Sequence, residues 1–443
     1  MRFIYNLGLL LILPVACFLL LRKRKGKPHP GGSAKEYFGW ATAIPPVGNK
    51  TKRKQKARDE KPIWIHAASV GEVIAIEPLV RHLRSSLPDT PVLVTTTTAT
   101  GKEQVLKLRA SDPHVHHRFM PLDLPWFIRL FIGRVQPRCL WLTEMEIWPN
   151  AIKIAHQFGL STSIINARMS IKSFNKYQNH PFIFKLAAPY IDKVLAQTTL
   201  DSDHFKQLGI DDQRVSITGS IKFDLTINQE KCHQGHVLRK TLGSQRFVWV
   251  AASTHDGEDL PLLKAHQRVL DAHPDAVLII VPRHPERFHS VYELALSQGF
   301  HTDKHSDTQK EPHLQKHSNP QPDCQVYIGD TLGDMFVYLS AADVCFMAGS
   351  LVGGKVGGHN PLEPAACQLP VINGPSYFNF TQIMEQLIDD GAVVIAESSD
   401  GIAHAVVELA DNPSKRIEMG QAGLRVVEQN KGAVERTLNA LIT

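Results

Sequence analysis

The stretch PIWIHAASVGE, residues 62–72, decides the fold. Its apolar run from Pro62 to Ala67 has the length of a buried strand, and after Ala68–Glu72 a helical stretch, Val73–Ser86, begins at once. A strand that passes directly into a helix is the start of a βαβ unit, in which helices connect parallel strands. The stretch therefore predicts an α/β fold, with Glu72 close to a helix N-terminus at the carboxyl end of a strand.

Short apolar runs and amphipathic stretches alternate along the rest of the chain in the same way. The first series of expected strands is Pro62–Ala67, Val92–Thr96, His116–Met120, Arg138–Leu142, Thr162–Ile165, Lys193–Ala196 and Val215–Thr218. The second is Phe247–Ala252, Ala276–Val281, Gln325–Ile328, Val344–Met347, Pro370–Ile372 and Ala392–Ile395. We predict two doubly wound, Rossmann-like domains that face a cleft, with ligands at the carboxyl ends of the strands.

Composition shifts suggest the boundaries of these domains. We expect an anchor with a basic flank at 1–27, a linker at 28–61, and domains at 62–230 and 231–425. The charged stretch Gln229–Ser244 looks like the interdomain connection, and a helix at 426–443 is expected to return towards the first domain.

The N-terminus has the composition of a membrane anchor. Phe3–Leu21 is almost entirely apolar and precedes the basic run RKRKGK at 22–27. A helix of this length covers about 28 Å, close to the roughly 30 Å of bilayer hydrocarbon. The positive-inside rule then leaves everything after the helix in the cytoplasm. A cleaved signal peptide fits poorly, because little positive charge precedes the apolar run, and a helix lying in the interface is the next alternative.

The overall composition excludes several classes of function. A net charge of +6 over 443 residues suits acidic substrates or anionic membranes but is too small to indicate nucleic acid binding. Six scattered cysteines indicate reduced thiols, and neither a Walker A sequence nor GxGxxG follows a strand. Residues 301–324 contain His301, His305, His313 and His317; a solvated loop is favoured over a metal site.

Acidic and basic residues follow the expected strands of the first half. Glu72 could act as a general base, or it could simply favour the helix dipole. Glu144 and Glu146 leave a strand together, and we expect one to line the cleft while the other packs locally. Lys222, in TGSIKFD, could be an ordinary surface charge or could neutralise a leaving phosphate.

The second half repeats this arrangement. Arg283 ends a strand and suits bidentate contact with a phosphate. The motif GDTLGD, residues 329–334, and the glycines at 353–358 follow later strands. Asn360 and Pro361 resemble the start of a helix whose amides bind an anion, and Glu363 suits ribose hydroxyls.

The motifs SVGE, TEMEIWPN, NARMS, TGSIKFD, STHDGED, PRHPERF, GDTLGD and GGHNPLEPAA resemble, in order, those of the 3-deoxy-D-manno-octulosonic acid (Kdo) transferases. The resemblance covers residues 35–435 and implies a GT-B fold, an inner-membrane location, CMP-Kdo as donor and a tetraacyl lipid A precursor, lipid IVA, as acceptor. It also implies inverting transfer without a metal or other cofactor, an acceptor-binding first domain and a CMP-sugar-binding second domain.

Carried over by motif, Glu72 would be the general base, and Glu144 and Lys222 would support the transition state. CMP would be held by Pro282, Arg283, Leu332, Gly333, Asp334, Asn360, Pro361, Leu362 and Glu363. Two departures from the family pattern affect the residues that would hold CMP. Leu332 and Asp334 stand where Met and Glu are usual, so Asp334 must reach its partner differently, and the loop at 353–358 is about two residues longer.

Two other functions remain open at this point. Another GT-B enzyme, a transferase or epimerase that uses a UDP-sugar, would share the fold but prefer uridine diphosphate. A non-catalytic, membrane-tethered module that binds sugar nucleotides would not need Glu72. The number of Kdo residues added, the acyl-chain preference and the oligomeric state are not encoded in any motif that we recognise.

Overall fold

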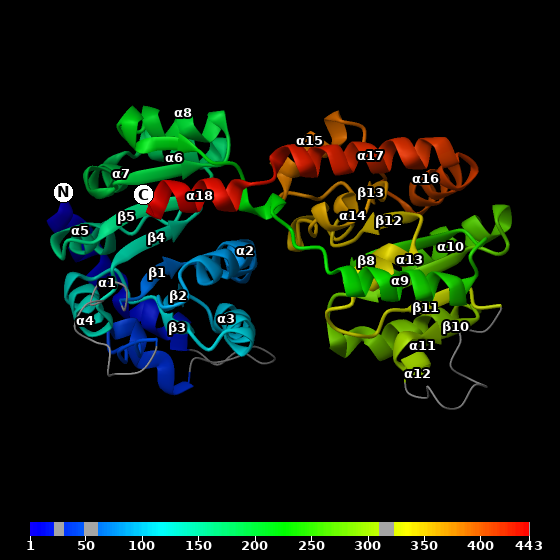
Figure 1. Cartoon of the computed structure of the whole chain (residues 1–443), viewed down its shortest axis with the longest axis horizontal. Coiled ribbons are helices and arrows are strands. Elements are labelled where there is room, and N and C mark those ends of the chain that lie inside the picture. The colour runs from blue at the N-terminus through cyan, green and yellow to red at the C-terminus, as the bar shows by residue number, and fades with distance from the viewer. Residues whose placement is uncertain (22–30, 48–60, 310–322, 443) are drawn as a thin grey trace. The chain divides into compact units, whose positions relative to one another are not determined.

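The computed structural model describes residues 1–21, 31–47, 61–309 and 323–442. The chain divides into two compact units, Met1–Asp224 with Asn430–Thr443, and Leu225–Gln429. Each unit contains a seven-stranded parallel sheet (Figure 1), which confirms the predicted α/β class and its two doubly wound halves. The basic run at 22–27, much of the linker, and His313 and His317 lie outside the described residues.

The first sheet has the strand order β3-β2-β1-β4-β5-β6-β7. Its strands are β1 Ile63–His66, β2 Val92–Thr96, β3 Val115–Phe119, β4 Cys139–Thr143, β5 Ser161–Ala167, β6 Lys193–Ala196 and β7 Val215–Ile217. The chain builds outwards from β1 in one direction and then returns to place β4 on its other side. The reversal between β1 and β4 is the topological switch point of this sheet.

Helices cover both faces of this sheet. They are α2 Val70–Ser86, α3 Ala99–Ser111, α4 Pro125–Val135, α5 Pro149–Gln157, α6 Ile171–Asn179, α7 Phe182–Ala187, α8 Thr199–Gln207 and α18 Ala433–Ile442. Of the residues that the structure describes, those of the N-terminal helix α1, Arg2–Leu21, contribute to neither of the cores on the two faces. Along β1, Ile63 and Ile65 join the core under α2, α3 and α18, whereas Trp64 joins the core under α4, α5 and α8. This alternation follows from the two-residue period of a strand.

The second sheet repeats the plan with the order β10-β11-β9-β8-β12-β13-β14. Its strands are β8 Val248–Thr254, β9 Val277–Pro282, β10 Thr302–Lys304, β11 Val326–Ile328, β12 Val344–Met347, β13 Val371–Asn373 and β14 Val393–Ile395. Here the direction reverses between β8 and β12, so this pair forms the second switch point.

The helices of the second unit include one where the sequence indicated a turn-rich connection. They are α9 Gln229–Leu242, α10 Asp259–Ala272, α11 Phe288–Ser297, α12 His305–Gln309, α13 Met335–Ala341, α14 Leu362–Ala366, α15 Thr381–Asp389, α16 Ser399–Asp411 and α17 Pro413–Asn430. The interpretation of Gln229–Ser244 as a connection was wrong, because α9 fills it and packs on α13. Only Gly235, Leu238 and Leu242 of α9 are buried, so its apolar face is too narrow to stand out in the sequence.

The expectation of an irregular loop at 301–324 was also partly wrong. Thr302–Lys304 forms the edge strand β10, and α12 follows it at once. His305 is buried, and its Nδ1 lies 2.9 Å from the hydroxyl of Tyr327, so this histidine belongs to the core of the unit.

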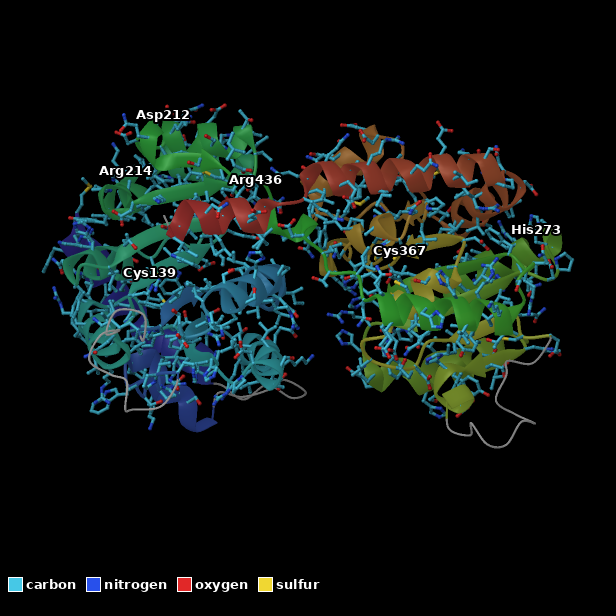
Figure 2. All side chains as sticks on the ribbon, in the orientation of Figure 1. Cys139, Asp212, Arg214, His273, Cys367 and Arg436 are labelled. Carbon is cyan, nitrogen blue, oxygen red and sulfur yellow. The ribbon has the colours of Figure 1, made fainter. Side chains whose placement is uncertain are left out.

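The last helix, α18, belongs to the first unit and is held there by Asp224. The Asp224 carboxylate accepts hydrogen bonds from the backbone amides of Gly432 and Val434, at 2.6 and 2.5 Å. Arg436, labelled in Figure 2, donates from Nε to the carbonyl oxygen of Thr218 at 2.9 Å. The two bonds to Asp224 satisfy amides that a helix N-terminus would otherwise leave without a partner.

We predict that Asp224→Ala lowers the free energy of unfolding of the first unit by about 1–3 kcal/mol, because two amides lose a charged acceptor. Thermal unfolding and limited proteolysis of the C-terminal helix measure the effect. Asp212→Ala, at an exposed position where the carboxylate pairs with Lys206, is the matched control and should change little. Equal stability of the two variants would contradict this role of Asp224.

Candidate active site

The first group of candidate residues lies at the switch point of the first sheet. Glu72 follows β1 and Glu144 follows β4, and these two strands are hydrogen-bonded neighbours. In open parallel sheets, ligands bind at the carboxyl ends of the strands beside such a reversal. The topology therefore places both carboxylates where a substrate is expected.

Glu72 is held in the first turn of α2 by the residues that begin the helix. Its Oε1 accepts a hydrogen bond from the Ser69 hydroxyl at 2.9 Å, and its Oε2 accepts one from the amide of Ala68 at 2.9 Å. Ser69 is the N-cap and accepts in turn from the Glu72 amide, so the sequence SVGE forms a variant of the capping box. Glu72 thus stabilises the helix start, and its half-buried carboxylate still reaches solvent.

Thr143 connects Glu72 to the neighbouring strand. Its hydroxyl oxygen lies 2.6 Å from Glu72 Oε2 and 2.9 Å from the carbonyl oxygen of His66. Both partners are acceptors when Glu72 is ionised, and the single hydroxyl proton can serve only one of them. A protonated Glu72 would donate to Thr143, which would then donate to His66. The arrangement therefore accommodates a proton on Glu72.

The pKa of Glu72 is raised above its ordinary value. Burial is the main cause, and the nearby charge of Glu146 adds to it, whereas the hydrogen bonds from Thr143, Ala68 and Ser69 oppose it. A carboxylate with a raised pKa is a better proton acceptor, which is the property that a general base needs.

Glu144 and Lys222 form an ion pair beside this carboxylate. Lys222 Nζ lies 3.1 Å from Glu144 Oε1, and both side chains are largely buried. Glu144 has a left-handed backbone, with φ of 51°, so the chain turns sharply where β4 ends. The Oδ1 of Asn166 accepts from the Ile221 amide at 3.1 Å and so fixes the turn that carries Lys222.

Glu146 has different partners, as expected for the second acid of the pair. Its Oε2 accepts a hydrogen bond from Trp148 Nε1 at 2.8 Å and lies 3.6 Å from His66 Nε2. Burial would raise the pKa of Glu146, but the interactions with His66 and Trp148 together lower it. Glu146 therefore provides a negative charge near Glu72 that helps to raise the pKa of Glu72.

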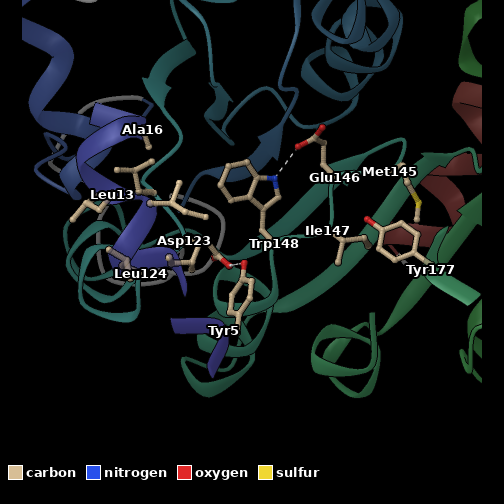
Figure 3. Close-up of a pocket in the computed structure, with 13 residues that line it drawn as sticks. Tyr5, Leu13, Ala16, Asp123, Leu124, Met145, Glu146, Ile147, Trp148 and Tyr177 are labelled. Atoms are coloured by element: carbon tan, nitrogen blue, oxygen red, sulfur yellow. Dashed lines mark hydrogen bonds between the residues drawn. The ribbon is translucent and has the colours of Figure 1, made fainter. Parts of the chain in front are cut away.

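A pocket of about 340 Å³ opens next to Glu146. Figure 3 shows that α1 provides one side of it and the segment after β4 provides another. Most of its lining residues are apolar; it consists of Tyr5, Leu9, Ile12, Leu13, Ala16, Leu122, Asp123, Leu124, Met145, Glu146, Ile147, Trp148 and Tyr177. The sequence did not indicate this pocket, because its walls are more than 100 residues apart in the chain.

The second unit has its own carboxylate across the switch point between β8 and β12. Glu258 is completely buried, and its Oε2 accepts from the amides of His255 at 2.9 Å and Gly349 at 2.7 Å. Its Oε1 accepts from the Leu351 amide at 3.0 Å. Glu258 thus fixes both loops at the carboxyl edge. It lies in the quoted motif STHDGED, where the sequence did not distinguish it from an ordinary acidic residue at a helix start.

Three histidines gather at the carboxyl edge of the second sheet. The sequence did not indicate this cluster. The Nε2 atoms of His255 and His359 are 2.8 Å apart with their rings stacked, and His284 meets His255 edge-on. Burial and neighbouring positive groups, Arg283 among them, lower the pKa of His255 to about 4 and of His359 to about 3. Both rings are therefore neutral at pH 7, so one donates its N–H to the other.

Gly349 makes room for this histidine pair. A Cβ atom at Gly349 would lie 2.8 Å from the His359 ring, and its backbone has φ of 73°. Both constraints favour glycine.

Arg283 is an exposed cation next to these histidines, at the carboxyl edge of the second sheet. It follows Pro282 at the buried end of β9, and its guanidinium makes no hydrogen bond or ion pair within the part of the chain that the structure describes. Its charge acts on His255, His359 and Glu363. An exposed guanidinium beside neutral rings is suited to an anionic ligand.

The motif around Asn360 differs slightly from the expected helix start. Helix α14 begins at Leu362, and Asn360 Oδ1 accepts from the Leu362 amide at 3.2 Å. Pro361 and Leu362 are buried, while Glu363 is half-buried, with its Oε1 3.5 Å from Asn360 Nδ2. Burial raises the pKa of Glu363, and Asn360 and Arg283 oppose this shift.

The residues of GDTLGD lie further from the switch point, because β9 separates β11 from β8. Leu332 is 69% exposed, and Gly333 has a left-handed backbone. Burial would raise the pKa of Asp334, but Lys231 of α9, at 2.7 Å, and Thr331 lower it. Its carboxylate is therefore already paired within the unit.

Comparison with known proteins identifies the family. The family model described as 3-deoxy-D-manno-octulosonic-acid transferase (kdotransferase) matches residues 34–225. The 3-deoxy-D-manno-octulosonic acid transferase of Haemophilus influenzae is 36% identical to this chain, over 99% of this chain and 98% of its own length. The enzyme of that name from Bordetella pertussis is 31% identical over the same shares. The chain belongs to the Kdo transferase family.

This Kdo transferase family member is therefore a glycosyltransferase, and its two parallel-sheet units have the GT-B fold. The fold resembles that of the UDP-GlcNAc 2-epimerase of Neisseria meningitidis, which is 14% identical over 86% of this chain and 99% of its own, with a TM-score of 0.56. Among the described residues, no group of three or more His, Cys, Asp or Glu side chains could hold a metal ion. All six thiols are free.

We predict that Thr143→Val moves the acidic limb of the pH–rate profile to higher pH. Glu72 must be ionised to accept a proton, and losing a hydrogen bond that lowers its pKa would leave it protonated over a wider pH range. The kcat/KM measured against pH tests this shift, with Thr143→Ser, which keeps the hydroxyl, as the control. A profile that drops in height without moving would contradict this role of Thr143.

Proposed function

We propose that this protein transfers Kdo from CMP-Kdo to a hydroxyl group of a lipid A precursor such as lipid IVA. The reaction inverts the anomeric centre and uses no metal ion. It takes place at the inner membrane, with both units in the cytoplasm. One observation carries the proposal: in a Kdo transferase family member, a carboxylate with a raised pKa, Glu72, stands at the switch point of the first sheet.

In the proposed reaction, Glu72 takes the proton of the acceptor hydroxyl as that oxygen attacks the anomeric carbon of Kdo. The bond from this carbon to the phosphate oxygen breaks, and CMP leaves with the electron pair. The bond between Kdo and the acceptor forms on the opposite face of the sugar. The proton on Glu72 then passes to water, which restores the base.

Lys222 provides positive charge near this base. Its ion pair with Glu144, which follows β4, fixes the ammonium group at the carboxyl edge of the sheet. A positioned cation stabilises negative charge that develops in the transition state, and it needs no reorganisation when the reaction occurs.

The carboxyl edge of the second sheet is proposed to hold CMP. Arg283 binds the phosphate, the neutral histidine pair offers an N–H next to it, and Glu363 accepts from the ribose hydroxyls. Pro282, Leu332, Gly333, Asn360, Pro361 and Leu362 complete the site. Since Lys231 engages the carboxylate of Asp334, this residue contributes through its backbone.

The fold alone does not separate this function from the use of a UDP-sugar, because the epimerase relative has the same architecture. Competition of CMP and UDP for binding distinguishes the two donors. A non-catalytic binding module is excluded if a Glu72 variant loses turnover but keeps nucleotide binding.

We predict that Glu72→Ala lowers kcat by at least about 100-fold and leaves the affinity for CMP unchanged, because only the proton acceptor is lost. Product formation from purified protein, CMP-Kdo and lipid IVA, followed by mass spectrometry, measures the loss. Glu77→Ala, further along the same helix with an exposed partner in Arg81, is the control. Normal turnover in Glu72→Ala would rule out the assigned base.

Arg283→Ala should weaken the binding of CMP by roughly 10- to 100-fold, because a charged hydrogen bond is worth about 1.5–3 kcal/mol. Calorimetry with the full chain gives the Kd. Arg268→Ala, which removes another cation of the second unit from an exposed pair with Asp400, should bind CMP normally. Equal affinity in both variants would place the phosphate elsewhere.

Chelation by EDTA should leave the rate of transfer unchanged, because protein cations and N–H groups neutralise the leaving phosphate in the proposed mechanism. A loss of activity that Mg²⁺ or Mn²⁺ restores would reject metal-independent transfer.

A further inference from the structure

The N-terminal helix α1 is docked on the first unit through its polar residues. Arg2 donates to the carbonyl oxygens of Pro149, at 3.1 Å, and Leu186. The hydroxyl of Tyr5 donates to Asp123 Oδ2 at 2.8 Å, which Figure 3 shows. Asn6 Oδ1 accepts from Asn150 Nδ2 at 2.7 Å. Every one of these α1 residues lies at the N-terminal end of the helix.

The partner of Tyr5 is part of the folded core. Asp123 is only 4% exposed, and its carboxylate also accepts from the amides of Asn150 and Ala151, at 3.0 and 2.8 Å. Asp123 thus joins the N-terminus of α1 to the N-terminus of α5. Burying a carboxylate is costly unless its oxygens are bonded, so this junction is a specific contact.

The opposite face of α1 is apolar and uncovered. It exposes Phe3, Leu7, Leu11 and Phe18, among others; Phe3 and Leu11 are 79% and 73% exposed. A continuous apolar face of this size is unfavourable in water and suits the acyl region of a lipid leaflet.

Docking of α1 and a bilayer crossing exclude each other. A helix of 20 residues is about 30 Å long, as thick as the hydrocarbon layer. If α1 crossed the bilayer with the basic run at 22–27 in the cytoplasm, Arg2 and Tyr5 would lie at the far surface. They would then be separated by the whole hydrocarbon core from Pro149 and Asp123 of the same unit.

We propose that α1 lies in the plane of the cytoplasmic leaflet, with its polar end bound to the first unit and its exposed face in the lipid. Both ends of the helix remain on the cytoplasmic side. The basic run that follows adds attraction to anionic headgroups. This arrangement replaces the single crossing that hydropathy and flanking charge predict.

The location of the N-terminus tests the proposal in intact cells. A short Gly-Ser tag with one cysteine is placed before Met1 of the full chain, and spheroplasts are treated with a membrane-impermeant maleimide. We expect labelling of the tag only after the membrane is permeabilised, while a periplasmic protein with a free thiol is labelled throughout. Labelling of the tag in intact spheroplasts would overturn the proposal.

Chemical cross-linking in native membranes tests the docking itself. In a Cys17→Ala background, Asn6→Cys with Asn150→Cys should form a disulfide on mild oxidation, because these side chains are in contact. The matched control, Leu7→Cys with Asn150→Cys, places the thiol on the exposed face and should not react. Failure of the first pair to cross-link, or equal reaction of both pairs, contradicts docking.

The geometry also points to an acyl chain as the occupant of the pocket beside Glu146. Leu9, Leu13 and Ala16 of α1 supply one wall, and Met145 and Ile147 supply another. The lining of the pocket includes both the helix that we place in the leaflet and Glu146, whose charge acts on Glu72. Resting on the proposed function, we assign it to one acyl chain of the lipid acceptor.

A pair of neighbouring substitutions tests this assignment. Ala16→Phe fills the pocket and should raise the KM for the fully acylated acceptor by about 10-fold or more, since apolar pockets discriminate chain size on this scale. An acceptor with shortened chains should be affected less. Val15→Phe, on the exposed face, should leave the KM for both acceptors unchanged.

These measurements separate failure of the pocket from failure of the function. Normal transfer with identical KM values in Ala16→Phe and Val15→Phe would overturn the pocket alone. No transfer to the lipid acceptor by the unmodified protein would overturn the proposed function.

Discussion

The hydroxyl of Thr143 is the contact on which the first half of the site depends. It joins the end of β4 to Glu72, at the start of the helix that follows β1, and so crosses the point where the strand order reverses. Parallel strands bring their carboxyl ends to one edge, but they do not by themselves orient the side chains there. The hydrogen bonds from Thr143, Ala68 and Ser69 provide that orientation for Glu72.

In the second unit a carboxylate, Glu258, also joins the two sides of the switch point, but its role is different. Glu258 is fully buried and accepts from three backbone amides, so it shapes the loops and has no access to a ligand. Glu72 is half-buried and shares a hydroxyl with a carbonyl oxygen, so a proton can be accommodated there. The same topological position therefore supports a reactive group in one unit and a structural group in the other.

The sequence was sufficient for the buried strands and for residues that follow them, because buried parallel strands are continuous apolar runs and their ends are marked by Gly, Pro and charge. It missed the polar, half-buried edge strand β10. It located Glu72, Glu144, Lys222 and Arg283 at sheet edges. It could not find Thr143, since a threonine at the end of a strand is common, nor the stacking of His255 on His359, which are 104 residues apart.

What the sequence did not show about α9 and α1 depends on contacts that form only in the folded unit. Helix α9 was missed because three buried residues give little periodicity, and its neighbour α13 supplies the rest of the packing. Hydropathy found α1 but could not reveal its docking, because Tyr5 meets Asp123 and Asn6 meets Asn150 only in the folded unit.

The return of α18 to the first unit has a consequence for biosynthesis. Ala433, Val434 and Leu438 fill the same core as Ile63 and Ile65, although the ribosome makes them only after the whole second unit. Domains of nascent chains generally fold in order from the N-terminus, but this first unit must wait with an open apolar face until translation of the second is complete. Its final closure therefore follows synthesis of the second unit, and until then the first unit exposes the apolar surface that α18 covers.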